Sequence, residues 1–141
     1  MRRQHCSLAD PIANDQTEER KVVYGKRGTQ NLSSPDEVRT FEHGRLEILN
    51  IGGGTVGRLT LEPEWRWSQH VKPVAGTQWC EAPHFQYQVS GRLHVLMEDG
   101  TEFELEPGDV SVLPTGHDAW VVGDEPVVLV DWYGASNYAK R

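Results

Sequence analysis

The chain has 141 residues, of which 37% are hydrophobic and 25% are charged; this suits one folded domain and excludes a long disordered polyelectrolyte. Its net charge of −7 repels nucleic acids and anionic lipids, so we expect neither a nucleic acid nor a membrane as partner. No stretch is apolar enough to span a bilayer, and no apolar signal core follows the charged first residues. We therefore expect a cytoplasmic, single-domain protein.

The first part of the chain differs in composition from the rest. Residues 1–37 are mostly polar, and we expect them to form a largely irregular arm beside a folded body at residues 38–141. At the end of the arm, Ser34 is a capping residue, Pro35 suits the first helical position, and two acids follow. This pattern predicts one short helical turn. The two cysteines lie far apart in the sequence, so we expect both to be free thiols.

From residue 38 onward, the pattern is that of short β-strands separated by turns. The strongest hairpin signal is Asp99-Gly100, a two-residue turn between two alternating runs. The longest interruption, residues 71–83, is expected to be a loop. Many short strands without a normal amphipathic helix predict an all-β sandwich or barrel. The predicted strands are residues 45–51, 55–62, 65–69, 84–90, 92–98, 101–106, 109–113, 119–122 and 127–132.

A glycine-rich run at residues 52–57 matches the spacing of a dinucleotide-binding fingerprint. That fingerprint requires a helix immediately after the glycines, because the helix N-terminus binds the pyrophosphate. Here the next residues, 58–61, alternate between polar and apolar like a strand. We therefore interpret the run as a glycine-rich hairpin.

Two spaced motifs carry a family resemblance. Gly108 is followed after five residues by Pro114 and then Gly116, and an earlier β-run closes at Gly91 in the phrase YQVSGRLHV. This resembles the cupin superfamily, in particular the small single-domain bacterial cupins, over roughly residues 59–132. The resemblance implies a jelly-roll barrel of two antiparallel sheets, and it supports a homodimer.

The metal-ligand positions of the family motifs are altered in this chain. His84 stands where the first motif has its glutamate, and His117 lies two residues before the histidine position of the second motif, which holds Ala119. One alignment of the first motif brings Cys80 to a histidine position, whereas another brings His70 there. The candidate metal ligands are therefore His70, Cys80, His84 and His117.

Imidazole and thiolate ligands favour zinc or iron(II), with one position open for water or substrate. A polar cavity without metal is the alternative interpretation of the same histidines.

Aromatic and amide side chains near these positions are candidates for binding a small molecule. Trp65 and Trp67 would share one strand face, and Trp65 and Trp132 are expected to fill the core. His94 is expected to be an exposed residue of a sheet. The candidate substrate-binding residues are Trp67, Trp79, Gln86, Gln88 and Trp120.

Two classes of function follow from this pattern. The first is a metal-binding cupin that acts on a small organic molecule in the barrel, as an oxygenase, isomerase or lyase. The second is a non-catalytic metabolite-binding or sensory cupin without bound metal. We expect a homodimer in either case, because an arm added to a neighbour's sheet edge would cover that edge.

Overall fold

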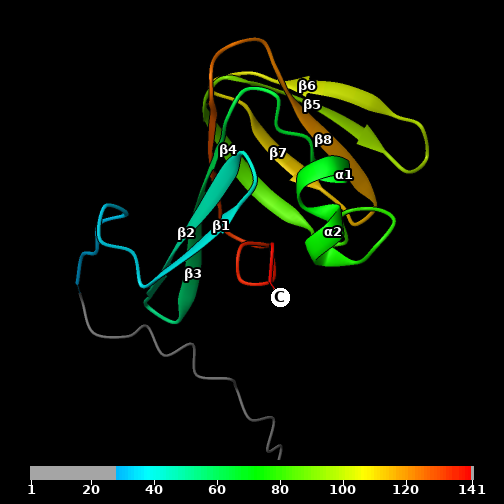
Figure 1. The fold of residues 1–141 in the computed structure, drawn as a ribbon. Helices are drawn as coiled ribbons and strands as arrows, with labels where there is room; N and C mark the ends of the chain where they lie inside the picture. Colours follow the sequence, from blue (N-terminus) through cyan, green and yellow to red (C-terminus); the bar gives the residue numbers. More distant parts are fainter. Residues whose placement is uncertain (1–27, 141) are drawn as a thin grey trace, which may run out of the picture.

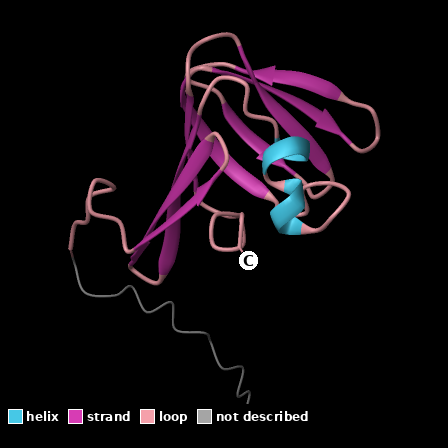
Figure 2. Ribbon diagram, in the orientation of Figure 1, coloured by secondary structure: helices cyan, strands magenta, loops and turns pink. Residues whose placement is uncertain are grey.

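The computed structural model describes residues 28–140 of the chain, and their regular secondary structure is mostly β-strand (Figure 2). The parts of the predicted arm at residues 1–27 lie outside the described residues. The elements in chain order are β1 (Glu37–Phe41), β2 (Gly44–Ile51), β3 (Gly54–Leu61), α1 (Trp67–His70), α2 (Lys72–Ala75), β4 (His84–Ser90), β5 (Arg92–Met97), β6 (Glu102–Leu105), β7 (Val110–Leu113), β8 (His117–Val122) and β9 (Val127–Asp131).

The strands form two antiparallel sheets that pack face to face (Figure 1). The larger sheet has six strands in the order β1-β2-β3-β9-β4-β7, and the smaller has three in the order β6-β5-β8. Strands distant in the sequence, such as β3 and β9, are therefore direct neighbours. The prediction of an all-β jelly-roll with two antiparallel sheets is confirmed.

Alternating burial along the strands places the core between the sheets. In β3 the inward residues Leu59 and Leu61 are each 2% exposed, and in β5 Val95 is fully buried. Each such side chain removes apolar surface from water and contributes roughly 1.5–3 kcal/mol to folding. Gly57 of β3 allows a close approach of the C-terminal residues, because a Cβ there would lie 2.4 Å from the Cβ of Ala135.

The predicted hairpins are present. Asp99-Gly100 turns the chain between β5 and β6, and the Asp99 side chain accepts a hydrogen bond from the backbone N–H of Thr101 at 2.9 Å. The glycine-rich run joins β2 to β3, with Gly52 and Gly53 at φ +60° and +79°, values that favour glycine. Because a strand follows, the dinucleotide fingerprint is excluded.

Two local predictions from the sequence are wrong. Residues 34–37 form no helical turn, because the N–H of Asp36 donates to Ile48 and its carboxylate accepts from the N–H of Asn50, which ties this segment to β2. Residues 65–69 form no strand; instead α1 begins at Trp67. The carboxylate of Asp118 in β8 accepts the N–H of Ser68 at 3.0 Å, which satisfies a donor of the first helical turn.

The predicted loop at residues 71–83 contains the second short helix, α2. Pro73 lies in its first turn, and Gly76 ends it in the left-handed conformation, φ +72°. Neither of the two described helices, each of four residues, is long enough to cross a membrane.

The C-terminal residues 132–140 fold back beneath the barrel, between β3 and α2 in Figure 1. Arg39 of β1 donates hydrogen bonds to the carbonyls of Ala135 and Tyr138, at 3.3 and 2.7 Å. The Tyr138 ring packs edge-on against Phe41 and is buried. Trp132, which was expected in the core, is 48% exposed, because β9 turns Asp131 inward and therefore turns the next residue outward.

Candidate metal centre

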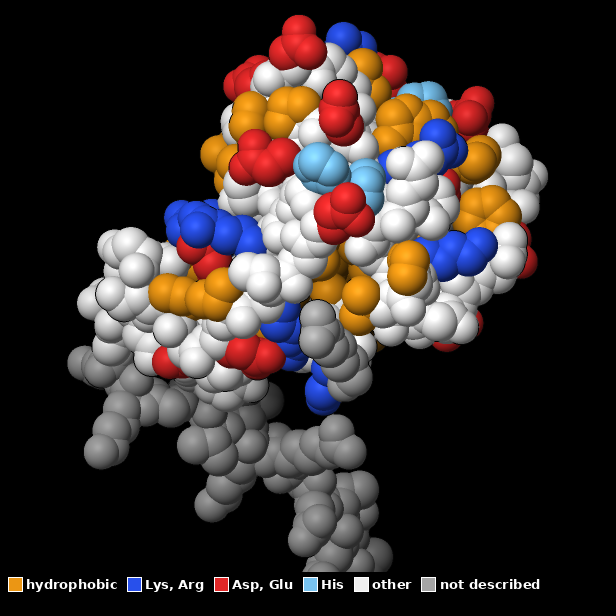
Figure 3. Space-filling view, viewed as in Figure 1, with side chains coloured by type: hydrophobic (Ala, Val, Ile, Leu, Met, Phe, Trp, Pro, Cys, Tyr) orange, Lys and Arg blue, Asp and Glu red, His pale blue; other side chains and the backbone are white. Residues whose placement is uncertain are grey.

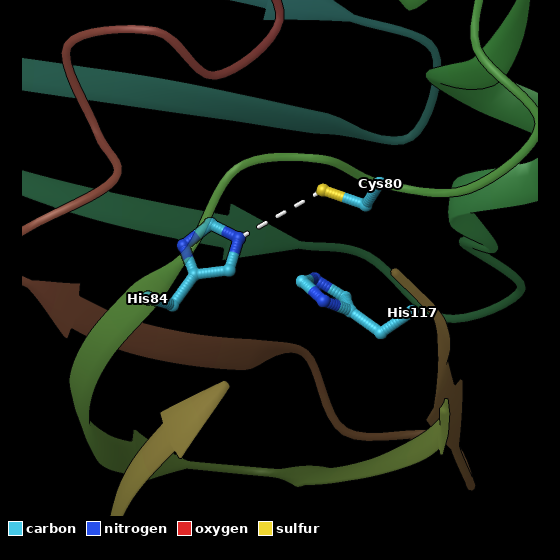
Figure 4. Close-up of side chains that lie close together, drawn as sticks. All are labelled: Cys80, His84 and His117. Atoms are coloured by element: carbon cyan, nitrogen blue, oxygen red, sulfur yellow. Dashed lines mark hydrogen bonds between the residues drawn. The ribbon is translucent and has the colours of Figure 1, made fainter. Parts of the chain in front are cut away.

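Cys80, His84 and His117 meet inside the barrel (Figure 4), and all three side chains are buried. Their possible ligand atoms all lie within 4.8 Å of one another. His84 begins β4 and His117 begins β8, whereas Cys80 lies in the loop before β4. Backbone pairing fixes the loop here, because the N–H of Cys80 donates to the carbonyl of His117 at 2.8 Å. Two strands and one loop therefore bring three metal-ligand side chains to one point.

His84 is held by a buried carboxylate. Its Nδ1 lies 2.5 Å from Oδ2 of Asp131 at the end of β9, and Asp131 is fully buried. Burial alone would raise the pKa of Asp131, but the hydrogen bonds from His84 and from the N–H groups of Tyr133 and Gly134 hold that pKa below its usual value. An ionised Asp131 keeps the proton on Nδ1 of His84. The Nε2 lone pair then faces the thiol of Cys80 and accepts its hydrogen, with Nε2 and Sγ 3.9 Å apart.

His117 is oriented in the same way by a backbone carbonyl. Its Nδ1 lies 2.9 Å from the carbonyl oxygen of Pro114, which can only accept, so Nδ1 carries the proton. Burial and the neighbouring His84 lower the pKa of His117 to about 4, against the opposing effect of the Pro114 hydrogen bond. His117 is therefore neutral near pH 7, and neutral imidazole is the form that binds metals.

Cys80 is a buried thiol rather than a reactive thiolate. Burial raises its pKa to about 12, so the thiol stays protonated near pH 7 without a metal ion. A free-thiolate nucleophile at this position is thus disfavoured. A bound cation would displace the proton, because coordination stabilises the thiolate.

The cavity beside the three side chains is small. It has a volume of about 30 Å³ and is enclosed mainly by apolar residues of both sheets, together with His84, His117 and Gln86. Such a volume suits one or two water molecules. The ring of Tyr138 packs edge-on against His84, with centroids 5.6 Å apart, and lines the cavity. A larger cleft of about 280 Å³ borders Tyr138 and Cys80 between α2 and the C-terminal residues.

His70, the fourth predicted ligand, does not join this cluster, so that prediction is corrected. It lies at the surface with Glu42 and His43, between α1 and the β1–β2 turn, where Figure 3 shows histidine and acidic side chains together. The N–H of Arg66 donates to Nδ1 of His70 at 2.9 Å. Neutral His70 therefore carries its proton on Nε2, which leaves no free lone pair there for a metal.

Two of the predicted substrate-binding residues line the small cavity, namely Trp67 and Gln86. Gln88 is buried too, but its amide donates to the carbonyls of Ser90 and Gly91 at the far end of β4. Trp79 is half-buried beside a separate surface hollow.

Trp120 faces the outside of the smaller sheet. There it stacks on His94, with centroids 4.4 Å apart, and Arg66 lies 4.2 Å above its ring. His94 faces away from the core, as predicted, although the stack leaves its side chain only 20% exposed. Trp79 and Trp120 are thus not brought to the cavity.

Sequence reasoning missed Asp131 and Tyr138. Asp131 carries a signal, since it is a lone acid that continues the inward register of Leu129 in an apolar strand. An inward carboxylate requires a buried partner. Tyr138 carries no comparable signal, because it lies in an irregular segment.

Comparison with known proteins gives a fold and no assigned activity. No protein-family model matches the chain. A stretch of 74 residues, 49% of this chain, is 38% identical to the tyrosine-protein kinase receptor TYRO3 of Xenopus laevis. The match spans only 8% of that receptor's length. A similar match, 39% identical over 74 residues, is found with the same receptor of Xenopus tropicalis.

Solved structures share the architecture. The formate complex of oxalate decarboxylase from Lactobacillus farciminis matches with a TM-score of 0.52 and 20% identity, over 72% of this chain and 32% of that protein. A protein of unknown function from Acidithiobacillus ferrooxidans matches with a TM-score of 0.49 and 18% identity, over 68% of this chain and 86% of that one. The paired antiparallel sheets and the match with the oxalate decarboxylase, at a TM-score of 0.52, agree, and the chain shares the jelly-roll fold expected from the cupin resemblance.

Proposed function

We propose that this chain is a metal-binding cupin in which His84, His117 and Cys80 hold one divalent transition metal ion. The observation that carries the proposal is the paired orientation of the two histidines. Each donates its Nδ1 proton to an acceptor, Asp131 or Pro114, so each presents Nε2 to the same buried point. Carboxylate or carbonyl partners behind the imidazole are typical of metal-ligating histidines.

The donor set favours zinc or iron(II). Two imidazole nitrogens and one thiolate are softer than the oxygen ligands that magnesium and calcium prefer. Three protein ligands leave one position open, as in catalytic zinc sites. Nε2 of Gln86 has no hydrogen-bond partner within residues 28–140 and lines the cavity. This amide could therefore orient a water or a small ligand at the open position.

A small organic molecule is the proposed ligand of this centre, with an oxygenase, isomerase or lyase as the enzyme class. When bound, the metal ion would act as a Lewis acid. The chain itself would keep the His84 imidazole fixed through Asp131 and exclude water with Tyr138. Because the cavity is only about 30 Å³, an organic molecule would enter only if the C-terminal residues moved towards the neighbouring cleft.

A non-catalytic cupin without metal is the second candidate. The observation that favours it is the small, mostly apolar cavity, whose lining includes Leu59, Leu61 and Leu129. In this case the histidines and the protonated Cys80 would be polar members of a packed core.

The metal content of the purified protein separates these candidates. Elemental analysis should find about one transition metal ion per wild-type chain, and His84→Ala and Cys80→Ser should lose it. His70→Ala is the matched control, because His70 has no free Nε2 lone pair, and it should keep the metal. A wild-type protein that neither contains nor takes up zinc or iron(II) would contradict the proposed metal centre and favour the non-catalytic cupin without metal.

A further inference from the structure

A cluster of large apolar side chains lies on the outer face of the six-stranded sheet. We name it the β4–β7 patch, and it extends onto the end of β9. Its six side chains are 39–67% exposed although all are large and apolar. They are Phe85, Tyr87, Val89, Val110, Val112 and Trp132.

Strand pairing makes the patch continuous. Phe85 is paired with Val112 and Tyr87 with Val110 across β4 and β7, so these side chains stand side by side. Trp132 adjoins them, since its ring centroid lies 6.1 Å from that of Phe85. The patch extends to the edge of the sheet, because β7 is the last strand beside β4 (Figure 1).

In β4 the distribution of polar and apolar side chains is the reverse of that in an ordinary surface strand. Its inward residues His84, Gln86 and Gln88 are polar and at most 5% exposed, whereas its outward residues are apolar. An antiparallel sheet with one face in water normally carries polar residues on that face. The outward face of β4 therefore has the composition of a covered surface.

The size of the patch suits a protein interface. With 150–250 Å² for a whole aromatic side chain, the exposed parts of the six residues together offer roughly 500 Å². A stable interface buries about 800 Å² on each partner, so the patch would supply well over half of it.

We propose that the β4–β7 patch is the interface of a homodimer, in which a second copy of this chain packs its own patch against it across a two-fold axis. Two identical apolar faces are complementary under this symmetry. None of the six side chains is charged, although the chain carries a net charge of −7. Contact between these six side chains and their copies thus brings no like charges together.

Part of the acidic surface lies on the smaller sheet. Glu102 and Glu104 are in β6 of the smaller sheet, which packs on the opposite side of the barrel core. Two copies joined through the larger sheet keep these carboxylates apart, whereas contact through the smaller sheets would oppose them. The charge distribution therefore favours the β4–β7 patch over the outer face of the smaller sheet.

The test is the solution mass of the full chain at micromolar concentration, measured by light scattering and analytical ultracentrifugation. The wild type should have twice the chain mass of 15.9 kDa. Val112→Asp should weaken association about a hundredfold or more, because it places a charge within the apolar interface. Val38→Asp is the matched control: Val38 is 52% exposed but lies in β1, at the other edge of the same sheet, and this variant should stay dimeric.

Circular dichroism of each variant shows whether it is folded, and Trp132→Lys replaces Val112→Asp if the latter does not fold. A monomeric wild type overturns the proposal and favours another occupant of the patch, such as residues 1–27 of the same chain. A folded Val112→Asp dimer, or a monomeric Val38→Asp, also overturns it, because the interface would then lie elsewhere. Metal content plays no part in this test, so it is independent of the proposed metal centre.

Discussion

Nδ1 of His84 lies 2.5 Å from the carboxylate of Asp131, a residue 47 positions further along the chain. The two meet because β4 and β9 are adjacent antiparallel strands whose register pairs Gln86 with Asp131. Both side chains point into the barrel, where Asp131 is fully buried. This contact fixes which nitrogen of His84 is free, and it links the core of the larger sheet to the chemistry of the site.

Asp131→Asn should weaken metal binding about 10- to 100-fold, because the amide can still accept the hydrogen bond but no longer supplies a negative charge behind His84. Isothermal titration of the metal-free protein with zinc measures the change. Asp124→Asn, at an exposed position in the turn before β9, is the control and should bind as the wild type does. Equal affinities of the wild type and Asp131→Asn would refute the role of Asp131.

Gly57→Ala should expose Cys80. The new methyl group would lie 2.4 Å from the Cβ of Ala135, so the C-terminal residues that close the cavity must shift. We expect Cys80 to react with a thiol reagent at least about tenfold faster, a change typical of increased local opening. The measurement uses a Cys6→Ser background, in which Cys80 is the only thiol.

Gly54→Ala is the matched control for that change, because it lies in the same strand and an added Cβ meets only the carbonyl of Ile51, at 3.6 Å. Its Cys80 should react at the wild-type rate. If both variants react equally, the C-terminal residues do not control access to the thiol.

Glu47→Gln should reduce the loss of stability in acid. Glu47 is almost fully buried and accepts a hydrogen bond from Arg58 at 2.7 Å. This hydrogen bond outweighs the opposing effect of burial and holds the pKa of the Glu47 carboxyl below its ordinary value of 4.5. Because the pKa is lower in the folded state, the ionised Glu47 stabilises the fold fully above about pH 4.5. This stabilisation disappears as the pH falls through the folded-state pKa of Glu47.

The wild type should therefore lose stability more steeply below pH 4.5 than Glu47→Gln, which should be about 1 kcal/mol less stable at neutral pH. Urea unfolding at a series of pH values measures both effects. The exposed Glu62 offers the control Glu62→Gln, which should follow the wild-type curve. A Glu47→Gln curve parallel to the wild type over the whole pH range would contradict the expectation.

Asp118→Asn should loosen α1. The Asp118 carboxylate accepts hydrogen bonds from the N–H of Ser68 at 3.0 Å and from Nε of Arg66 at 3.2 Å. Since hydrogen bonds to a charged group contribute about 1.5–3 kcal/mol, we expect a loss of about 1–2 kcal/mol in the free energy of unfolding. Hydrogen exchange of the α1 amides should also become faster. Unchanged exchange at Ser68 would show that the helix does not depend on this carboxylate.

Much of the fold could be predicted from alternation and turns. The Asp99-Gly100 hairpin, the glycine hairpin before β3 and the buried strand residues follow from local rules that need no knowledge of distant contacts. The errors have tertiary causes. Residues 67–70 form a helix where a strand was predicted, because Asp118, from a distant strand, accepts an N–H in the first turn.

The candidate site could be predicted only in part. His84, His117 and Cys80 stand out by residue type and motif spacing, and the structure brings them together. His70 has the same residue type, but the N–H of Arg66 occupies its Nδ1, and no sequence pattern reveals that hydrogen bond.

The composition by itself determined that this chain is acidic, and the alternating pattern determined the all-β class of residues 28–140, because side-chain period and turn chemistry are local properties. Only the tertiary structure decided which histidines present a free nitrogen to one point. It also decided that Asp131 lies behind His84 and that β4 turns its apolar face outward. These outcomes depend on which strands become neighbours, and strand order arises from contacts between residues far apart in the sequence.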